Sequence, residues 1–149
     1  MEPSFRVAEP SDADALIGMM RGLYEHDRTA FDESPHRAAL AQLFANDAYG
    51  LAYLMLSGAE VAGYFVITFG FSLEFRGRDA FIDELFVKDE FRGRGAGAAA
   101  IRFAEGLCRE RGVRALHLEV ERSNTGAQSV YRRAGFRDHD RYLLTKWLL

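Results

Sequence analysis

The sequence predicts an α/β protein in which helices flank a mixed β-sheet. Three observations lead to this class. Short apolar runs bounded by turn residues fill the middle of the 149-residue chain and are typical of strands. Apolar residues spaced three or four apart come before and after these runs, which indicates amphipathic helices. A glycine-rich loop joins one strand directly to one such helix. The elements follow the order βααβββαβαβ.

The N-terminal third contains a short strand and two helices. Phe5-Arg6-Val7-Ala8 is the expected opening strand. Ser11 with Asp14 three residues later is a variant of the capping box, so we expect a helix to begin there. Ser34-Pro35 predicts the start of a second helix, because proline suits the first position after a cap. Between the two helices, Tyr24–Thr29 is expected to be a polar, mobile connection.

Three strands are expected in the middle of the chain. Leu51–Leu56 and Val61–Phe69 flank the sequence Ser57-Gly58-Ala59-Glu60, which predicts a hairpin turn. The polar segment Ser72–Asp79 follows as a connection. The apolar run Ala80–Val87 then predicts a buried strand.

The remaining elements alternate between helix and strand. After the glycine loop comes an alanine-rich helix that ends at Gly112. Leu116–Val120 predicts a strand, and Ala127–Arg133 a short helix closed by Gly135. Tyr142–Leu148 is expected to be a last strand. The apolar face of the alanine-rich helix consists of Ala100, Phe103, Ala104, Leu107 and Cys108.

Composition indicates an ordinary globular protein, and we expect residues 1–149 to form a single domain. Apolar residues make up 48% and charged residues 28% of the chain. No apolar run approaches the ~20 residues that span a bilayer. The N-terminus lacks the basic start and apolar core of a signal peptide, so we expect a cytoplasmic location. Cys108 is the only cysteine, which excludes an internal disulfide.

The net charge of −3 hides an asymmetry between the halves of the chain. Residues 1–75 carry 4 basic and 11 acidic side chains, whereas residues 76–149 carry 15 basic and 11 acidic ones. The basic half would suit an anionic cofactor and the acidic half a cationic substrate. Solvated acidic surface without function is the alternative for the first half. A pI near 5.8 and the lack of a basic stripe interleaved with aromatics argue against nucleic acid as a partner.

The loop within Lys88–Ala99 has the chemistry of a phosphate site. Its glycines allow positive φ and a close approach of the backbone to a ligand. The first N–H groups of the following helix lack internal partners, and the helix dipole favours an anion there. Arg92 and Arg94 can add charge-assisted hydrogen bonds.

Two common phosphate motifs are excluded by spacing. A Walker loop needs a lysine followed by Ser or Thr, and neither stands at the required place. A Rossmann turn needs Gly-x-Gly-x-x-Gly near the start of a βαβ unit, whereas three strands precede this loop. What remains is Arg-x-x-Gly-x-Gly over residues 92–97, which by itself is a weak pattern.

Four stretches in order resemble the GNAT family, the Gcn5-related N-acetyltransferases. Ala80–Val87 is similar to the family's fourth strand and Phe91–Gly97 to its pyrophosphate loop. Leu116–Val120 is similar to the fifth strand. Residues 124–136 resemble the signature Asn-x-x-Ala-x-x-x-Tyr-x-x-x-Gly-Phe. The consecutive acidic residues Asp83-Glu84 also resemble the acidic pair of the diamine acetyltransferase branch.

The resemblance implies a GNAT fold, with a mixed, mostly antiparallel central sheet of six to seven strands and about four helices. It implies acetyl-CoA as the acetyl donor, with no metal, bound where the fourth and fifth strands separate. The acceptor amine attacks the thioester directly, without an acyl-enzyme. The resemblance assigns the pantetheine arm to Leu85, Phe86 and Val87, the pyrophosphate to Arg92, Gly93, Arg94, Gly95, Ala96 and Gly97, and a further contact with the cofactor arm to Asn124.

Tyr131 is the candidate general acid, because direct attack releases a thiolate that a nearby phenol can protonate. Its alternative role is to pack the short helix against the sheet, where a buried tyrosine needs one hydrogen bond. Asn124 has an alternative as well, as a turn or cap residue.

Asp83 and Glu84 are the candidate bases. Two carboxylates within an apolar strand are costly unless they are paired or solvated. A regular strand would point them to opposite faces, which a β-bulge would change. An ammonium substrate must lose a proton before it attacks, and a desolvated carboxylate can accept it directly or through water. We favour Glu84, with Asp83 second. The alternative is a structural ion pair with an arginine.

Other reactive side chains are given structural roles. Cys108 lies on an apolar helix face and is expected to be inert. His117 is expected to be an ordinary sheet residue. The four histidines lack ligand spacing, so no metal site is expected. Arg132 and Arg133 could reach the 3′-phosphate of CoA, but a solvated helix face is the favoured interpretation.

The sequence thus predicts an acetyl-CoA-dependent N-acetyltransferase that acts on a primary amine. A small cationic amine, of polyamine or aminoglycoside type, suits the acidic N-terminal half. A protein lysine or N-terminus is the alternative acceptor. A non-catalytic acyl-CoA-binding module is the alternative from another class. A homodimer is possible, and no membrane partner is expected.

Overall fold

The computed structural model describes residues 2–149 and contains one five-stranded sheet in the order β1-β2-β3-β4-β5. The first four strands pair antiparallel with their neighbours, and β5 pairs parallel with β4. The predicted mixed, mostly antiparallel sheet is therefore confirmed. The strands are β1 Ser4–Val7, β2 Gly50–Ser57, β3 Glu60–Ser72, β4 Gly77–Val87 and β5 Ala115–Leu118.

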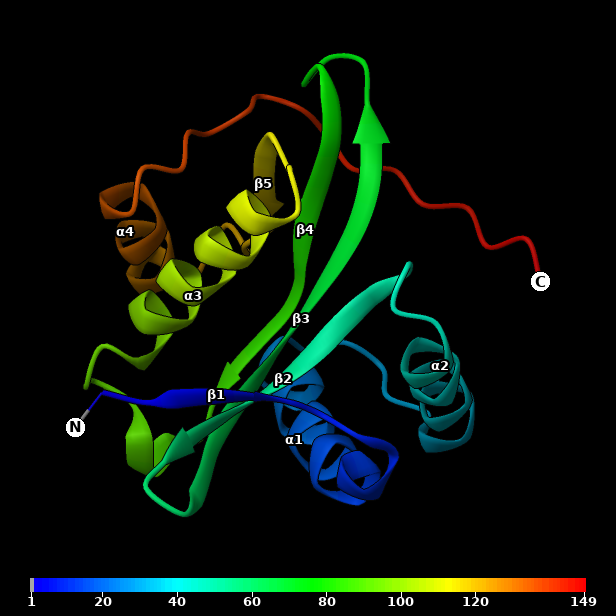
Figure 1. Ribbon diagram of the computed structural model, residues 1–149, viewed down its shortest axis with the longest axis vertical. Helices are drawn as coiled ribbons and strands as arrows, with labels where there is room; N and C mark the ends of the chain where they lie inside the picture. The colour runs from blue at the N-terminus through cyan, green and yellow to red at the C-terminus, as the bar shows by residue number, and fades with distance from the viewer. Residues whose placement is uncertain (1) are drawn as a thin grey trace.

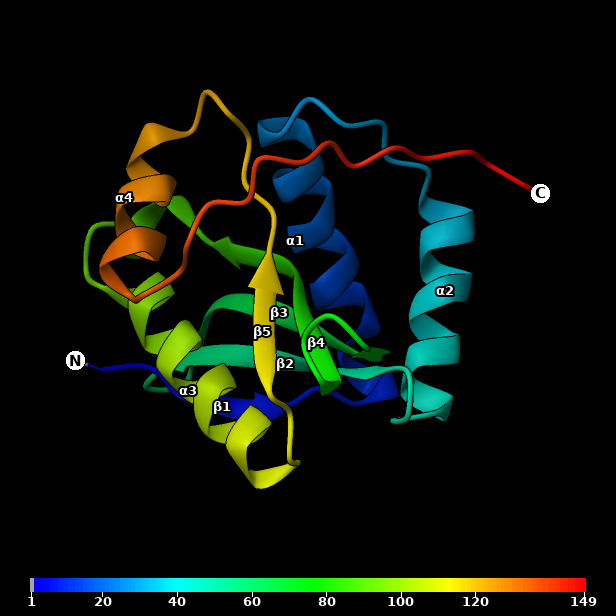
Figure 2. The same ribbon diagram turned by 90° about the horizontal axis from the view of Figure 1, so that it is seen from above.

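Helices cover both faces of the sheet, with α1 and α2 on one face and α3 and α4 on the other (Figure 2). Four α-helices agree with the predicted number for the described residues. None of the helices within residues 2–149 is long and apolar enough to cross a membrane. The helices are α1 Ala13–His26, α2 Glu33–Ala45, α3 Ala96–Glu110 and α4 Thr125–Arg133, with 3₁₀ turns η1 Pro10–Asp12 and η2 Asp89–Phe91.

The sheet divides the core into two layers because successive strand residues point to opposite faces. Tyr64 and Val66 of β3 pack with the buried residues of α1 and with Leu40 of α2. Phe65 and Ile67, the next residues along the same strand, pack with the apolar face of α3. The acidic N-terminal segment and the glycine-loop helix therefore lie on opposite sides of one sheet.

Several turns form where the sequence predicts them. Ser57–Glu60 is the hairpin between β2 and β3, with Gly58 at φ 62°. Gly112 and Gly135 follow the ends of α3 and α4 with φ of 69° and 101°. These left-handed conformations strain other residues, so glycine stops both helices.

The predicted helix starts are wrong by one or two residues. The residue that precedes α1 is Asp12 rather than Ser11, and the one that precedes α2 is Asp32 rather than Ser34. Near α1 the cause is a 3₁₀ turn. Asp12 Oδ2 accepts a hydrogen bond from the Glu9 N–H at 2.8 Å and pairs with Arg6 at 2.9 Å, which fixes the turn before the helix begins.

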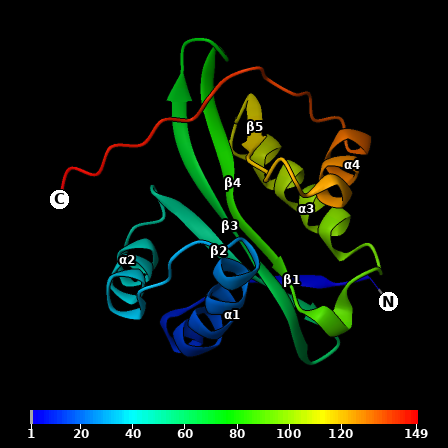
Figure 3. The ribbon, with the colours of Figure 1, turned by 180° about the vertical axis from the view of Figure 1, so that it is seen from behind.

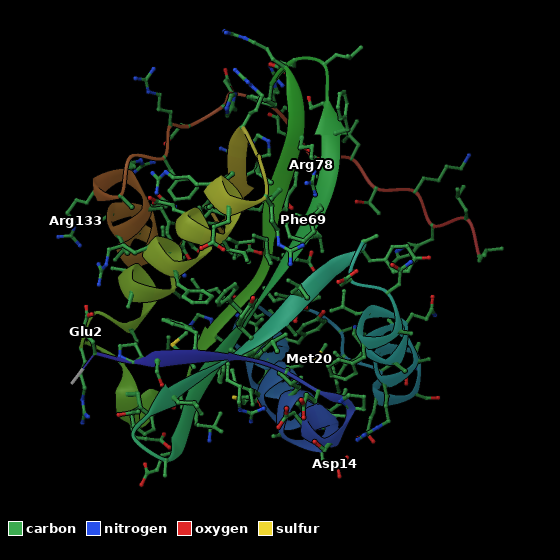
Figure 4. All side chains as sticks on the ribbon, in the orientation of Figure 1. Glu2, Asp14, Met20, Phe69, Arg78 and Arg133 are labelled. Atoms are coloured by element: carbon green, nitrogen blue, oxygen red, sulfur yellow. The ribbon has the colours of Figure 1, made fainter. Side chains whose placement is uncertain are left out.

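Two regular elements extend further than predicted. Helix α1 continues to His26, so half of the expected polar connection Tyr24–Thr29 is helical. Strands β3 and β4 extend into the expected connection Ser72–Asp79, which shortens to Leu73–Arg76. The added strand residues are stabilised by side chains across the pair, since the Arg78 guanidinium lies 5.7 Å from the ring centre of Phe69 (Figure 4).

The predicted last strand, Tyr142–Leu148, is wrong, because residues 137–149 contain no helix or strand. The sheet of the described chain accordingly has five strands rather than six to seven. After α4 the chain crosses the turn between β3 and β4 and then leaves the body of the molecule (Figures 1 and 3). Apolar composition alone does not make a strand, because the backbone groups must also find a partner.

We predict that Gly63→Ala destabilises the protein by about 1–3 kcal/mol, the usual cost of overpacking. Gly63 pairs with Val87 at the end of β4, and a Cβ there would lie 2.1 Å from the Phe86 carbonyl oxygen. The strands would have to separate. Urea denaturation measures the change.

The matched control is Gly106→Ala in α3, where an added Cβ meets nothing within 4 Å. Because alanine is the better helix former, this variant should gain about 0.5–1 kcal/mol. Equal stabilities for the two variants would contradict the close approach at Gly63.

Candidate active site

The candidate site is a groove that opens where β4 and β5 separate. Their parallel pairing runs from Asp79 opposite Ala115 to Ile82 opposite Leu118 and stops there. Strand β4 continues to Val87, paired only with β3. Figure 1 shows β4 extending well past the end of β5. The β5-facing backbone edge of residues 83–87 therefore borders the groove, whose volume is about 1780 Å³.

A β-bulge in β4 lies where this pairing ends. Two consecutive residues of β3, Val66 and Ile67, pair with Glu84 and Ile82 of β4. Asp83 lies between these two β4 residues and has no partner on β3. A bulge bends its strand and increases the local twist. The bend directs the rest of β4 away from β5. The bulge considered from the sequence is thus present, at the first of the two acidic residues.

Glu84 is held by two tyrosines from different elements. Its Oε2 accepts a hydrogen bond from the Tyr24 hydroxyl of α1. Its Oε1 accepts one from the Tyr64 hydroxyl of β3 at 2.9 Å. Burial raises the pKa of Glu84, the two phenol hydrogen bonds act against that rise, and the nearby Asp83 adds to it. The net direction is upward because loss of hydration opposes the charged form.

Asp83 has a different environment. The Asp83 side chain is exposed, and it lines the groove. The surrounding walls reduce its hydration and raise its pKa. Within residues 2–149 neither Asp83 nor Glu84 forms an ion pair with an arginine. The alternative of a structural ion pair is therefore wrong for both carboxylates.

The two tyrosines that hold Glu84 were not identified from the sequence. Tyr24 falls in a segment predicted to be a mobile connection, and Tyr64 is one aromatic residue within an apolar strand. The sequence separations of 60 and 20 residues from Glu84 leave no spacing signal. The burial cost of a carboxylate in a strand indicated that partners were needed, but did not indicate which residues they are.

The glycine loop has the backbone conformation expected of an anion site. Gly93 and Gly95 have φ of 76° and 78°, in the left-handed region. Gly95 is the N-cap of α3 and offers no side-chain cap. The N–H groups of Ala96, Gly97 and the following residue are unpaired within the helix, because the first intrahelical bond is donated by the residue after them. These donors lie at the groove.

The two loop arginines differ in their contacts. Arg92 Nε donates to the Val87 carbonyl oxygen at 2.8 Å, and its guanidinium pairs with Asp89 at 2.9 Å. It thus holds the loop against the end of β4. Arg94 lies over the Phe91 ring at 5.8 Å and does not line the groove. The structure gives Arg92 a clear structural role in addition to its place beside the groove.

Asn124 and Tyr131 belong to the opposite wall of the groove. Asn124 caps α4, since its Oδ1 accepts a hydrogen bond from the Ala127 N–H at 3.1 Å. Tyr131 packs edge-to-face with Phe136 at 6.1 Å between ring centres. Burial raises the pKa of Tyr131, and the carboxylate of Asp27 raises it further. Asn124 therefore has the capping role and Tyr131 the packing role that the sequence offered as alternatives. Both side chains still line the groove.

The lining of the groove carries both signs of charge. The unpaired helix amides lie near Arg92, and carboxylates share the rest of the lining with Arg102, Arg122, Arg133 and Arg141. No group of three His, Cys, Asp or Glu within residues 2–149 is arranged to hold a metal ion. The acidic lining residues are Asp27 after α1, Asp83 and Glu84 in β4, Glu105 in α3, and Glu119 and Glu121 after β5.

The fourth and fifth strands of the sheet thus separate beside a helix whose N-cap is Gly95, and the groove opens there. The model of the acetyltransferase (GNAT) family matches residues 12–136. The chain therefore belongs to the GNAT family, as the four sequence stretches indicated.

Similar proteins have related descriptions. A thialysine N-epsilon-acetyltransferase from Bos taurus is 25% identical over 146 residues, which cover 89% of this chain and 83% of that protein. An uncharacterized N-acetyltransferase from Methanocaldococcus jannaschii is 41% identical over 67 residues, or 45% of this chain. This match spans only 29% of that relative's length, and a match to a Bacillus subtilis relative spans 38% of its length.

Among solved structures, an integron cassette protein from the mobile metagenome of a salt marsh superposes with a TM-score of 0.84. It is 34% identical, and the match covers 97% of this chain and 90% of that one. The predicted fold is confirmed by this similarity together with the family match.

We predict that Tyr64→Phe raises the pKa of Glu84 further. The lost hydroxyl donates to the carboxylate and so favours its ionised form. The ¹³C chemical shift of the Glu84 side-chain carboxyl, followed from pH 3 to 9, measures the pKa.

Tyr49→Phe is the control, because Tyr49 is 57% exposed and forms no hydrogen bond with Glu84 through its side chain. An unchanged or lower pKa of Glu84 in the Tyr64 variant would contradict the hydrogen bond as a stabiliser of the charge.

Proposed function

We propose that this chain is an acetyl-CoA-dependent N-acetyltransferase that acetylates a small, cationic primary amine. The observation that carries the proposal is the juxtaposition in one groove of an open strand edge, unpaired helix amides and two desolvated carboxylates. The open strand edge and the helix amides suit acetyl-CoA, the acetyl donor. The carboxylates suit an amine acceptor.

Acetyl-CoA fits the donor part of the groove. Extended peptide-like arms bind by adding to an open strand edge, which Leu85–Val87 offers. A pyrophosphate suits the unpaired N–H groups at the start of α3 and the helix dipole behind them. The left-handed Gly93 and Gly95 let the backbone approach closely. Arg92 preserves this arrangement by joining the loop to β4.

A cationic amine suits the carboxylates that line the groove. Asp27, Asp83 and Glu119 line it and attract a positive charge. The bovine relative named as a thialysine N-epsilon-acetyltransferase acts, by its name, on a small amine, and it matches most of this chain. This relative favours a small amine because its match covers 89% of this chain, whereas a Bacillus subtilis relative named as a putative ribosomal protein bS18-alanine N-acetyltransferase matches 38% of it.

Bound acetyl-CoA supplies a thioester whose acetyl group is transferred to the amine nitrogen. Glu84 accepts a proton from the ammonium, directly or through water, because its raised pKa makes it a stronger base than an exposed glutamate. Asp83 stands next to it in the groove and holds the cation. Tyr131 donates its phenol proton to the departing sulfur, and the second proton that the nitrogen loses as the amide forms restores the phenol. A C–N bond forms and a C–S bond breaks, so no covalent bond to the protein is needed.

We predict that Glu84→Gln lowers kcat by about 10²–10⁴-fold, the usual contribution of a positioned acid or base. Tyr131→Phe should lower it by about 10²-fold. In the unaltered protein kcat/KM should fall as the pH drops through the raised pKa of Glu84, above its ordinary 4.5. The measurement is thiol release from acetyl-CoA with a panel of diamines, aminoglycosides and a lysine peptide.

The outcomes separate the parts of this proposal. CoA binding without turnover on any amine would indicate a non-catalytic module instead. Turnover on the peptide alone would move the acceptor to proteins. If Asp83→Asn stops turnover and Glu84→Gln does not, the base is Asp83.

We also predict that Gly95→Ala weakens acetyl-CoA binding by about 5- to 30-fold. Alanine at φ 78° costs about 1–2 kcal/mol, which the loop would relieve by moving its amides. Isothermal titration calorimetry measures the affinity. Gly106→Ala, on the same helix and in open space, is the control and should bind normally.

A further inference from the structure

We propose that His36 is a positioning residue for Glu84, because its ring holds Tyr24, whose hydroxyl donates to the Glu84 carboxylate. His36 belongs to the first turn of α2 and is not among the residues that line the groove. It therefore acts on Glu84 through Tyr24 and not through contact with a substrate. This role rests on the proposed function of Glu84 as the base, but the packing behind it can be measured without turnover.

The two phenols that hold Glu84 differ in how firmly each is fixed. Tyr64 lies within β3 and is fully buried, so the surrounding core keeps its ring in place. Tyr24 is half-buried and lies two residues before the end of α1. The last turn of a helix frays more readily than its middle, because its carbonyl groups lack partners within the helix. The Tyr24 hydroxyl therefore depends on contacts outside α1 to stay beside Glu84.

Two aromatic rings supply such contacts. The His36 ring meets the Tyr24 ring edge-to-face, with 5.0 Å between the ring centres and 88° between the planes. Phe31, in the connection between α1 and α2, packs on Tyr24 at 5.4 Å and on His36 at 4.7 Å. Edge-to-face contacts are favourable because the edge of one ring is positive and the face of the other is negative. His36 and Phe31 thus confine the Tyr24 ring from outside its own helix.

His36 is itself held in one orientation. Its Nδ1 lies 2.6 Å from the carbonyl oxygen of Asp32, the residue that precedes α2. Because a carbonyl oxygen only accepts, Nδ1 carries the hydrogen and donates it. This bond joins the ring to the start of its own helix. The backbone of α2 therefore fixes the ring that packs on Tyr24.

The charges around Glu84 agree with this role. Glu84 faces phenols from α1 and β3, Asp83 in its own strand and His36 from α2. Burial raises the pKa of Glu84, the two phenol hydrogen bonds lower it, Asp83 raises it and a protonated His36 lowers it. A well-held Tyr24 and a protonated His36 therefore favour the same, ionised form of Glu84. Charged side chains beside the aromatic rings pair with one another: Arg21 with Glu33 at 2.5 Å, and Arg37 with Asp14 at 2.7 Å.

A double-mutant cycle tests whether His36 acts through Tyr24. The pKa of Glu84 is measured from the ¹³C shift of its side-chain carboxyl in the unaltered chain, His36→Ala, Tyr24→Phe and the double variant. We expect His36→Ala to raise this pKa, because a loosened Tyr24 donates less often to the ionised carboxylate. In the Tyr24→Phe background the same substitution should have little effect, since the hydroxyl that transmits it is absent.

Two results of this cycle would overturn the proposal. Equal changes of the Glu84 pKa in both backgrounds mean that His36 acts on the carboxylate directly, by its charge. An unchanged Glu84 pKa in His36→Ala means that Tyr24 keeps its place without the imidazole ring.

His36→Phe separates the ring from its charge, because phenylalanine keeps an aromatic ring at this position and cannot be protonated. We expect the Glu84 pKa in this variant to lie closer to that of the unaltered chain than to that of His36→Ala. Equal values in the two variants would contradict a role of the ring.

His139→Ala is the control for the loss of an imidazole ring elsewhere. His139 packs edge-to-face on Phe75 at 6.0 Å and is not among the residues that line the groove. The Glu84 pKa should be unchanged in this variant. Far-ultraviolet circular dichroism checks that all variants fold, and His36→Leu replaces the alanine variant if that one does not.

Steady-state kinetics with acetyl-CoA and the best acceptor amine connect the packing to the reaction. We expect His36→Ala to lower kcat by about 10- to 100-fold with KM little changed, because a misplaced base slows the reaction without removing a substrate contact. The acid limb of kcat/KM should move to higher pH, in step with the Glu84 pKa. An unchanged kcat in a protein whose Glu84→Gln variant is inactive would overturn the positioning role. If the unaltered chain acetylates no amine, the proposed function fails, whereas a Glu84 pKa coupled to His36 through Tyr24 still supports the positioning role.

Discussion

Pairing between β4 and β5 stops where β4 gains its extra residue, and the groove follows from that constraint. Asp83 has no partner on β3, so the strand bends, and residues 83–87 lose contact with β5. The same bulge leaves the neighbouring Asp83 and Glu84 in one groove with different surroundings. One inserted residue thus provides both an open backbone edge and two carboxylates beside it.

Glu84 illustrates how a buried charge is made tolerable without an opposite charge. Two phenols donate to its two oxygens, which satisfies the carboxylate while keeping its pKa raised through loss of hydration. An arginine partner would have done the opposite and lowered the pKa. The tyrosines also join three elements, since α1, β3 and β4 meet at one side chain. The carboxyl group is therefore fixed in position while it retains the ability to exchange a proton.

The sequence was sufficient for those parts of the fold that depend on local patterns. Gly112 and Gly135 end helices because of their own backbone freedom, and Ala80–Val87 forms a strand because of its composition. Partners distant in sequence could not be predicted. Tyr24 and Tyr64 meet Glu84 only after the chain folds, and Arg92 turns back to the Val87 carbonyl. Residues 142–149 were predicted to be a strand for the same reason. Their composition suits a strand, but it cannot show whether a backbone partner lies beside them.

The two-layer core has an evolutionary consequence. Tyr64 and Val66 pack only toward α1 and α2, whereas Phe65 and Ile67 pack toward α3, so the sheet separates two sets of apolar contacts. Substitutions that reshape α1 and α2 can accumulate without repacking the helix that carries the glycine loop. A lineage could therefore change the residues on one side of the sheet while the side that carries the glycine loop stays constant. Proteins with this fold can therefore diverge by substitutions in one core layer at a time.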